Sequence, residues 1–272
     1  MTHAERIARG KGWTRGTTLV FLLSAPGVPA IAADAFSTDW APAAKSEARL
    51  VAAGGALAGF EIRLAPGAIT YWRDPGEAGV PPTFDVSGSD NVASVKPTFP
   101  APKRIKEPDG SEAFGYDGGV VILLKVEPRD PAKPVTLSLA ADYAVCEKLC
   151  LPAKANLKLT LPGAASPYAA AVEAALAAAP RPVAPETFGT LAGDAASGWR
   201  LCAAREAGPP RDLFVEPPEG WWVSAAPAPG GGTEDCFAIT LREKPKDASL
   251  PVPLRLTMTG GTGAKETTVV AH

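Results

Sequence analysis

The 272-residue sequence predicts an all-β protein, with two tandem immunoglobulin-like β-sandwich domains joined by a short helix and a proline-rich linker. Three observations lead to this fold class. Apolar and polar residues alternate with the period of half-buried strands in both halves of the chain. Turn-forming clusters separate these runs, and the 29 prolines and 27 glycines exceed the usual shares of about 5% and 7%. One alanine-rich segment has helical spacing instead.

In the first half of the chain, residues 60–64, 135–139 and 157–161 alternate, and 120–126 is a nearly continuous apolar run of strand length. Turn-forming clusters such as Asp74-Pro75-Gly76 lie between these runs. Many short strands with this spacing are typical of an immunoglobulin-like sandwich. We therefore expect such a domain over residues 34–163.

One helix is expected after this domain. Ser166 is suited to cap it, and Pro167 is suited to its first turn. Tyr168, Val172 and Leu176 then recur every four residues in an alanine-rich segment that stops before a proline. This spacing predicts a short helix.

A proline-rich segment, Pro-Arg-Pro-Val-Ala-Pro over 180–185, follows the helix and is typical of a stiff spacer between domains. Together with the helix it forms the connection that we expect over 164–187. The remaining residues, 188–272, alternate again in three runs, at 199–201, 237–241 and 254–258. They predict a second β-sandwich domain, small enough that a disulfide would help to stabilise it.

Residues 1–33 have the pattern of an export signal. Four basic residues precede an apolar run over 19–25, and the small-residue sequence Ala30-Ile31-Ala32 follows as a cleavage site. An uncleaved anchor is the alternative, but proline and glycine interrupt the run well before the ~20 apolar residues that a spanning helix needs. We expect cleavage after Ala32 or Ala33, and an exported chain without stable membrane insertion.

Composition excludes several classes of function. The chain has 27 basic and 29 acidic residues, so no basic excess favours binding to nucleic acid. The two histidines, His3 and His272, stand at the extreme ends, which argues against histidine-based nucleophiles and histidine-ligated metals. The sequence contains no phosphate-binding loop, metal motif or catalytic triad, so we expect no cofactor and no metal.

The chemistry of the chain is expected at its four cysteines. In an oxidising compartment an even number favours disulfides, and four cysteines allow three pairings. Proximity and domain position favour Cys146 with Cys150 and Cys202 with Cys236. Cys202 and Cys236 each stand one residue out of phase with the apolar residues of their strands, so a cross-strand bridge is reasonable. We interpret this second pair as structural; a second redox pair is the alternative.

The pair Cys146 and Cys150 encloses only three residues and lies between two predicted strands. Such a bridge removes little entropy from the unfolded chain, whereas a pair at an exposed strand end is easily reached by another thiolate. From the spacing alone, redox activity and a merely structural hairpin disulfide both stay open. A zinc site that uses all four cysteines is disfavoured, because the second pair lacks close ligand spacing.

The residues around this pair are more informative than its spacing. The segment 143–153, YAVCEKLCLPA, resembles the redox segment of the N-terminal periplasmic domain of the DsbD and ScsB proteins. Residues 71–82, YWRDPGEAGVPP, and Phe114-Gly115-Tyr116 resemble the same family. The resemblance is densest over 40–162 and is only loose in the second domain. The cysteine spacing is shorter than in the best-known members of the family.

The resemblance implies an immunoglobulin-like domain whose Cys146/Cys150 dithiol shuttles two electrons in the periplasm. The donor would be a membrane-embedded, DsbD/CcdA-like electron carrier, and the acceptors would be thioredoxin-fold periplasmic proteins. Such exchange is that of a protein-disulfide reductase, and it needs no histidine because a thiolate is the nucleophile. By analogy with the family, Cys150 is the expected attacker.

The resemblance also implies a cap loop whose aromatic residue shields the cysteines, and the segment 109–116 with Phe114 matches it best. Tyr116, Tyr143 and Trp72 are the other candidates for a cap or partner surface, with core packing as the alternative for Phe114 and Trp72. A different class of function also stays open, namely a non-catalytic immunoglobulin-like binding module in which both disulfides are structural.

Overall fold

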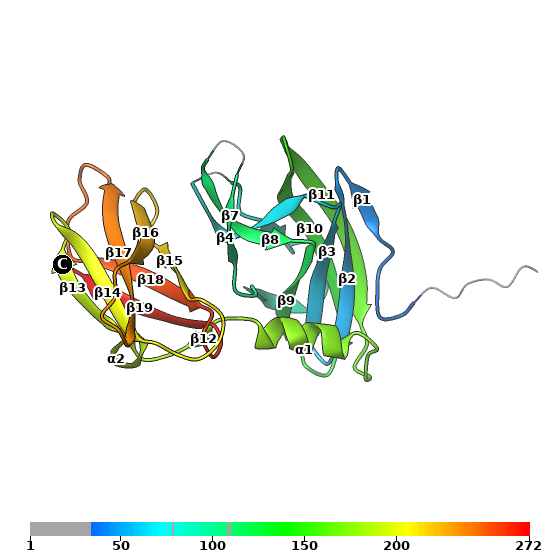
Figure 1. Cartoon of the computed structure of the whole chain (residues 1–272). Coiled ribbons are helices and arrows are strands. Elements are labelled where there is room, and N and C mark those ends of the chain that lie inside the picture. The colour runs from blue at the N-terminus through cyan, green and yellow to red at the C-terminus, as the bar shows by residue number, and fades with distance from the viewer. Residues whose placement is uncertain (1–33, 78, 108–109) are drawn as a thin grey trace, which may run out of the picture. The chain divides into compact units, whose positions relative to one another are not determined.

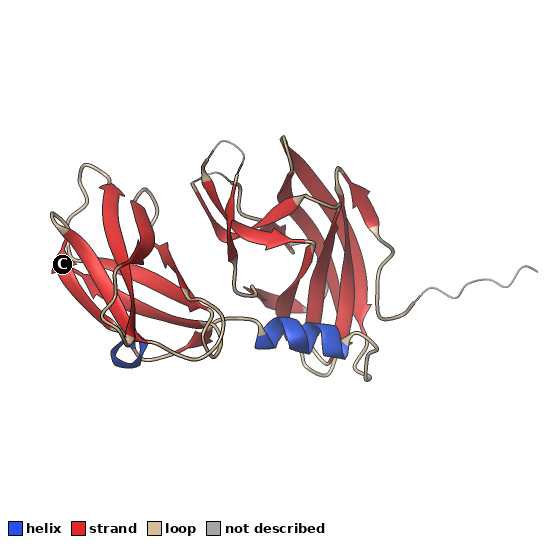
Figure 2. Cartoon of the chain, viewed as in Figure 1, coloured by secondary structure: helices blue, strands red, loops and turns tan. Residues whose placement is uncertain are grey.

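The structure is a computed structural model, and it describes residues 34–77, 79–107 and 110–272. The predicted export signal at 1–33 lies outside these residues. The described part, Asp34–His272, forms one compact unit that consists mainly of strands (Figures 1 and 2). Within it, no helix has the length and apolar character needed to cross a membrane.

The first sandwich packs two antiparallel sheets. One sheet has the order β1 (Ala41–Ala43), β2 (Ser46–Gly54), β3 (Leu57–Leu64), β9 (Gly119–Pro128) and β6 (Val92–Thr98). The other has the order β11 (Cys150–Leu161), β10 (Val135–Cys146), β4 (Ile69–Gly76), β8 (Glu112–Asp117) and β7 (Lys103–Lys106), and β5 (Thr83–Asp85) pairs with β10. The four strands that alternation and apolar character predicted in this half lie within β3, β9, β10 and β11.

Alternation explains why these segments pack as they do. Phe60 and Ile62 of β3 are buried, whereas Arg63 of the same strand is exposed. In β10 and β11, apolar residues pair across the ladder, as in Leu137 with Leu159, and both point into the same core. Burial of these apolar side chains is the main force that holds the two sheets together.

The helix α1 (Ala169–Ala177) packs on the outside of the first sandwich through Val172, which lies in a buried cluster with Val51 and Leu123. It begins later than the sequence predicted. Ser166 lies before the helix, and its Oγ accepts a hydrogen bond from the Tyr168 N–H at 3.0 Å. Leu176, the third residue of the predicted spacing, is exposed, because Ala175 takes the second buried position.

The second sandwich consists of two sheets as well, each with four strands. One has the order β12 (Arg181–Pro182), β19 (Lys265–Ala271), β18 (Val252–Thr259) and β15 (Asp212–Glu216). The other has the order β13 (Thr190–Asp194), β14 (Gly198–Ala204), β17 (Glu234–Glu243) and β16 (Trp222–Ala228), and the short helix α2 (Pro185–Phe188) precedes it. The segment expected as a free spacer therefore supplies an edge strand, because the Arg181 N–H donates to the carbonyl of Ala264 at 3.0 Å.

Candidate redox site

The Cys146–Cys150 disulfide closes the tip of the β10–β11 hairpin. β10 ends at Cys146 and β11 begins at Cys150, and these two residues are the last register pair of the ladder. The two sulfurs differ in their surroundings. Cys146 is 2% exposed, whereas Cys150 is an exposed residue. A thiolate from another protein therefore meets Sγ of Cys150 first.

Tyr71 of the neighbouring strand β4 contacts both sulfurs. Its hydroxyl oxygen lies 2.6 Å from Sγ of Cys146 and 3.4 Å from Sγ of Cys150. Burial, with a smaller effect from the charge of Glu107, raises the pKa of the Tyr71 phenol to about 12. The phenol is therefore protonated at neutral pH and can donate a hydrogen bond to a thiolate at Cys146.

An apolar wall surrounds Cys146 on the sheet side. It consists of Ile69 and Tyr71 of β4, Ala113 of β8, Ala144 of β10 itself and the partly buried Ile105 of β7. Close backbone packing holds the wall together, since a Cβ atom at Gly115 would lie only 2.0 Å from the carbonyl oxygen of Thr70. Glycine at position 115 therefore lets β8 approach β4 beside the cysteines.

The tip residues between the cysteines carry charge and an apolar side chain. Glu147 forms an ion pair with Lys45 at 3.0 Å. Lys154, four residues after Cys150, forms an ion pair with Asp142 at 2.6 Å. Leu149 is 71% exposed and leaves an apolar contact point beside Cys150.

The comparisons with known proteins agree with this geometry. The family model for the N-terminal domain of the thiol:disulfide interchange protein DsbD matches residues 40–162, a segment that includes both cysteines of the tip. Residues 40–162 are a DsbD/ScsB-like N-terminal domain. The resemblance stated from the sequence motifs is thereby confirmed, and the match ends where the first sandwich ends.

A solved structure extends the likeness to both sandwiches. The N-terminal periplasmic domain of ScsB from Proteus mirabilis aligns with a TM-score of 0.70 and 21% sequence identity, over 88% of this chain and 99% of that one. At this identity the match shows the fold, so the prediction of an all-β chain with immunoglobulin-like sandwiches is confirmed. No curated protein matches the chain.

Within the DsbD-like domain, Phe114 points away from the cysteines. Its strand neighbour Ala113 belongs to the wall around Cys146, and successive residues of a strand face opposite sides of the sheet. Phe114 packs instead against Phe214 of the second sandwich, with ring centroids 4.8 Å apart. The predicted cap segment therefore packs against Cys146 through Ala113, and not through its aromatic residue Phe114. Asp109, at the start of that segment, lies outside the described residues.

The other aromatic candidates for a cap or partner surface are buried in the core of the DsbD-like domain. Trp72 is fully buried, the Tyr116 hydroxyl donates to the carbonyl of Pro100 at 2.8 Å, and the Tyr143 hydroxyl lies 3.0 Å from Oγ of Ser46. These are the positions of core residues, so they present no surface to a partner. Tyr71, which was not among these candidates, is the aromatic residue that touches the sulfurs.

The remaining cysteines form the Cys202–Cys236 disulfide between β14 and β17, where the two residues are a register pair. Both bonds follow the predicted pairing. Glu234 lies close to this second pair, but the two sulfurs are bonded to each other and therefore offer no thiolate to a metal ion. This bond lies outside the DsbD-like domain.

Proposed function

We propose that this chain is a periplasmic thiol:disulfide interchange protein. The Cys146/Cys150 dithiol would carry electrons from a membrane-embedded, DsbD/CcdA-like carrier to thioredoxin-fold proteins of the periplasm. One observation supports this above all: the exposed residue Cys150 is bonded to the buried Cys146, whose sulfur contacts the Tyr71 hydroxyl, within a DsbD-like domain.

The transfer to a client follows the usual course of disulfide exchange. In the reduced chain, the thiolate of Cys150 attacks one sulfur of the client disulfide. The client S–S bond breaks, a mixed disulfide forms at Cys150, and the displaced client sulfur takes up a proton. The thiolate of Cys146 then attacks Sγ of Cys150, re-forms the intramolecular bond and releases the second client sulfur as a thiol. Two electrons and two protons have passed to the client.

Reduction of the chain by its donor uses the same sulfur. A thiolate of the donor attacks the exposed Sγ of Cys150, and Cys146 leaves as a thiolate beside the Tyr71 hydroxyl. The second thiol of the donor then attacks the donor sulfur in the mixed disulfide, so that the donor is oxidised and Cys150 is released. A hydrogen bond from a protonated phenol stabilises the leaving thiolate of Cys146.

Trapping of mixed disulfides tests this assignment. In a Cys146→Ala variant the attacker is present but the resolving thiol is missing, so incubation with an oxidised thioredoxin-fold protein should accumulate a covalent complex. Cys150→Ala should form none or far less. A Cys202→Ala/Cys236→Ala variant is the matched control and should exchange like the wild-type chain. Absence of a complex from Cys146→Ala, with every oxidised candidate, would favour the non-catalytic binding module instead.

A further inference from the structure

The β7–β8 hairpin has two faces with different neighbours. Ile105 and Ala113 are a register pair, and both belong to the apolar wall around Cys146. Arg104 and Phe114 are the adjacent register pair, and they project from the other face. One face of the hairpin therefore packs against Cys146, and its other face carries Arg104 and Phe114.

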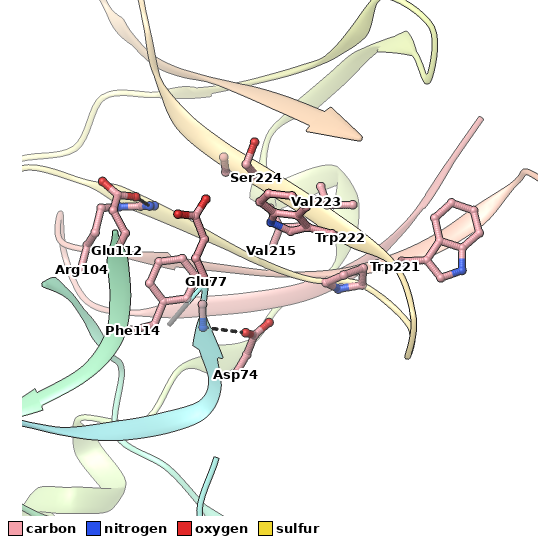
Figure 3. A pocket seen from close by; sticks show the side chains of 13 residues that line it. Asp74, Glu77, Arg104, Glu112, Phe114, Val215, Trp221, Trp222, Val223 and Ser224 are labelled. Atoms are coloured by element: carbon pink, nitrogen blue, oxygen red, sulfur yellow. Dashed lines mark hydrogen bonds and ion pairs between the residues drawn. The ribbon is translucent and has the colours of Figure 1, made fainter. Parts of the chain in front are cut away.

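The second sandwich contacts this other face through strand β15. The Arg104 guanidinium donates to both carboxylate oxygens of Asp212, from Nε at 2.9 Å and from Nη2 at 3.0 Å, and Nη2 also donates to the Leu213 carbonyl at 2.9 Å. Phe114 and Phe214 pack edge to face, with ring planes at 88°. Figure 3 shows Arg104 and Phe114 among the residues that line a pocket together with Val215 of this strand.

These contacts are well suited to hold the hairpin in place. The bond from Arg104 to Asp212 has two parallel N–H donors, which fixes its geometry as well as its strength. Both side chains are shielded from solvent, with 15% and 24% exposure, so water screens the pair less than an ordinary surface ion pair. Phe214 is 1% exposed and forms part of the core of the first sandwich.

A second anchor holds the strand that carries Tyr71. Arg73, two residues along β4, donates from Nε and Nη2 to the carboxylate of Glu216, each at 2.8 Å, and from Nη2 to Glu266 at 2.8 Å. The strands β4, β7 and β8, which supply wall residues around Cys146, are therefore all tied to the second sandwich.

We propose that Asp212 and Phe214 of the second sandwich are positioning residues for the redox site. They hold the β7–β8 hairpin so that Ile105 and Ala113 stay packed against Cys146, and this packing keeps the buried sulfur away from thiols and water. The second sandwich thereby limits how accessible the thiol of Cys146 is after the bond has opened. This inference rests on the proposed exchange at that bond.

The test uses the full chain and a small dithiol, so it needs no protein partner. Asp212→Asn removes the charge that pairs with Arg104. Arg104→Gln removes the same contact from the other side, together with the bonds of Arg104 to Glu112 and to the Leu213 carbonyl. Asp235→Asn is the matched control, because Asp235 pairs with Arg205 at 2.8 Å within the second sandwich. Two rates are measured for each chain: reduction of the Cys146–Cys150 bond by dithiothreitol, and alkylation of Cys146 in the reduced chain by iodoacetamide.

We expect alkylation of Cys146 to become about 3- to 10-fold faster in Asp212→Asn and Arg104→Gln, since local opening governs access to a buried group. Reduction by dithiothreitol, which attacks the exposed Cys150, should stay near the wild-type rate. The double variant should be no faster than Arg104→Gln, because that change already removes the contact with Asp212. Asp235→Asn should match the wild type, and alkylation of the exposed Cys150 should not change in any variant.

Four outcomes would overturn the inference. An unchanged rate of alkylation of Cys146 in both variants, with a wild-type bond that dithiothreitol reduces, would show that the contact does not position the hairpin. Additive effects in the double variant would show that the two residues act separately. A wild-type bond that resists dithiothreitol would overturn the proposed exchange itself, and this inference with it. A merely structural role would lower the thermal stability without selective exposure of Cys146.

Discussion

The hydroxyl oxygen of Tyr71 lies 2.6 Å from Sγ of Cys146, although 75 residues separate them in the sequence. The contact joins strand β4 to the end of β10, and it places a proton donor beside the sulfur that would leave as a thiolate. Because the phenol keeps its proton at neutral pH, the contact favours the charged form of Cys146 when the disulfide opens.

Replacement of this hydroxyl should slow exchange. Tyr71→Phe keeps the ring that packs in the wall and removes only the hydrogen bond. A hydrogen bond to a charged group contributes about 1.5–3 kcal/mol, part of which is present in the transition state, so we expect reduction of the bond to slow about tenfold. Stopped-flow reduction by dithiothreitol measures this. Tyr143→Phe is the control, because its hydroxyl contacts Ser46 instead. Equal rates for wild type and Tyr71→Phe would contradict the prediction.

The titration of Tyr71 gives a second prediction. Its folded-state pKa is raised from 10.0 to about 12, chiefly by burial. Folding therefore favours the neutral phenol. This contribution to stability is complete below pH 10 and is lost as the pH rises from 10 to about 12. The difference in ultraviolet absorbance between wild type and Tyr71→Phe should titrate with a midpoint near pH 12. A midpoint near 10 would mean that the phenol is open to solvent.

The exposed side chain of Leu149 should matter to protein partners and not to small thiols. It is 71% exposed beside Cys150, so a partner whose disulfide approaches that sulfur covers it. We expect Leu149→Ser to slow exchange with a thioredoxin-fold protein about five- to tenfold, as loss of one apolar anchor of an interface does. Reduction by dithiothreitol should stay the same. Val270→Ser, at another exposed apolar residue, is the control and should affect neither rate.

The two disulfides should differ in what they contribute to stability. On the chain-entropy model, the Cys202–Cys236 bond, with a separation of 34 residues, contributes about 4 kcal/mol, and the Cys146–Cys150 bond, with a separation of 4, about 2 kcal/mol. Urea denaturation of the two paired Cys→Ala variants measures both values. A larger loss from the Cys146/Cys150 variant would indicate that the tip disulfide serves mainly to stabilise the fold.

Strands and disulfides were predictable from the sequence because both depend on local patterns. Residues 135–139 and 157–161 alternate strictly, and the two strands then pair over their full length. The Cys146–Cys150 bond was predictable because its partners are four residues apart and both belong to one hairpin tip. These features need no knowledge of how distant segments pack.

The parts that could not be predicted depend on register and on long-range contacts. The strand β8 reads Glu-Ala-Phe-Gly-Tyr-Asp, which has no clear alternation, so the sequence does not tell that Ala113 faces the sulfurs and Phe114 the second sandwich. The pairing of β12 with β19 involves two residues of a proline-rich segment and leaves no pattern. To predict the contact of Tyr71 with Cys146, one would have to know that β4 pairs with β10 in the sheet.

The long hairpin that ends at the sulfurs has one more consequence. β10 and β11 are each 12 residues long, and the two cysteines are only their last pair. When the bond opens, the ladder below it keeps its partners, so the backbone has almost nothing to rearrange. The oxidised and reduced chains then share one conformation. Repeated cycling should therefore expose no unpaired sheet edge that leads to aggregation.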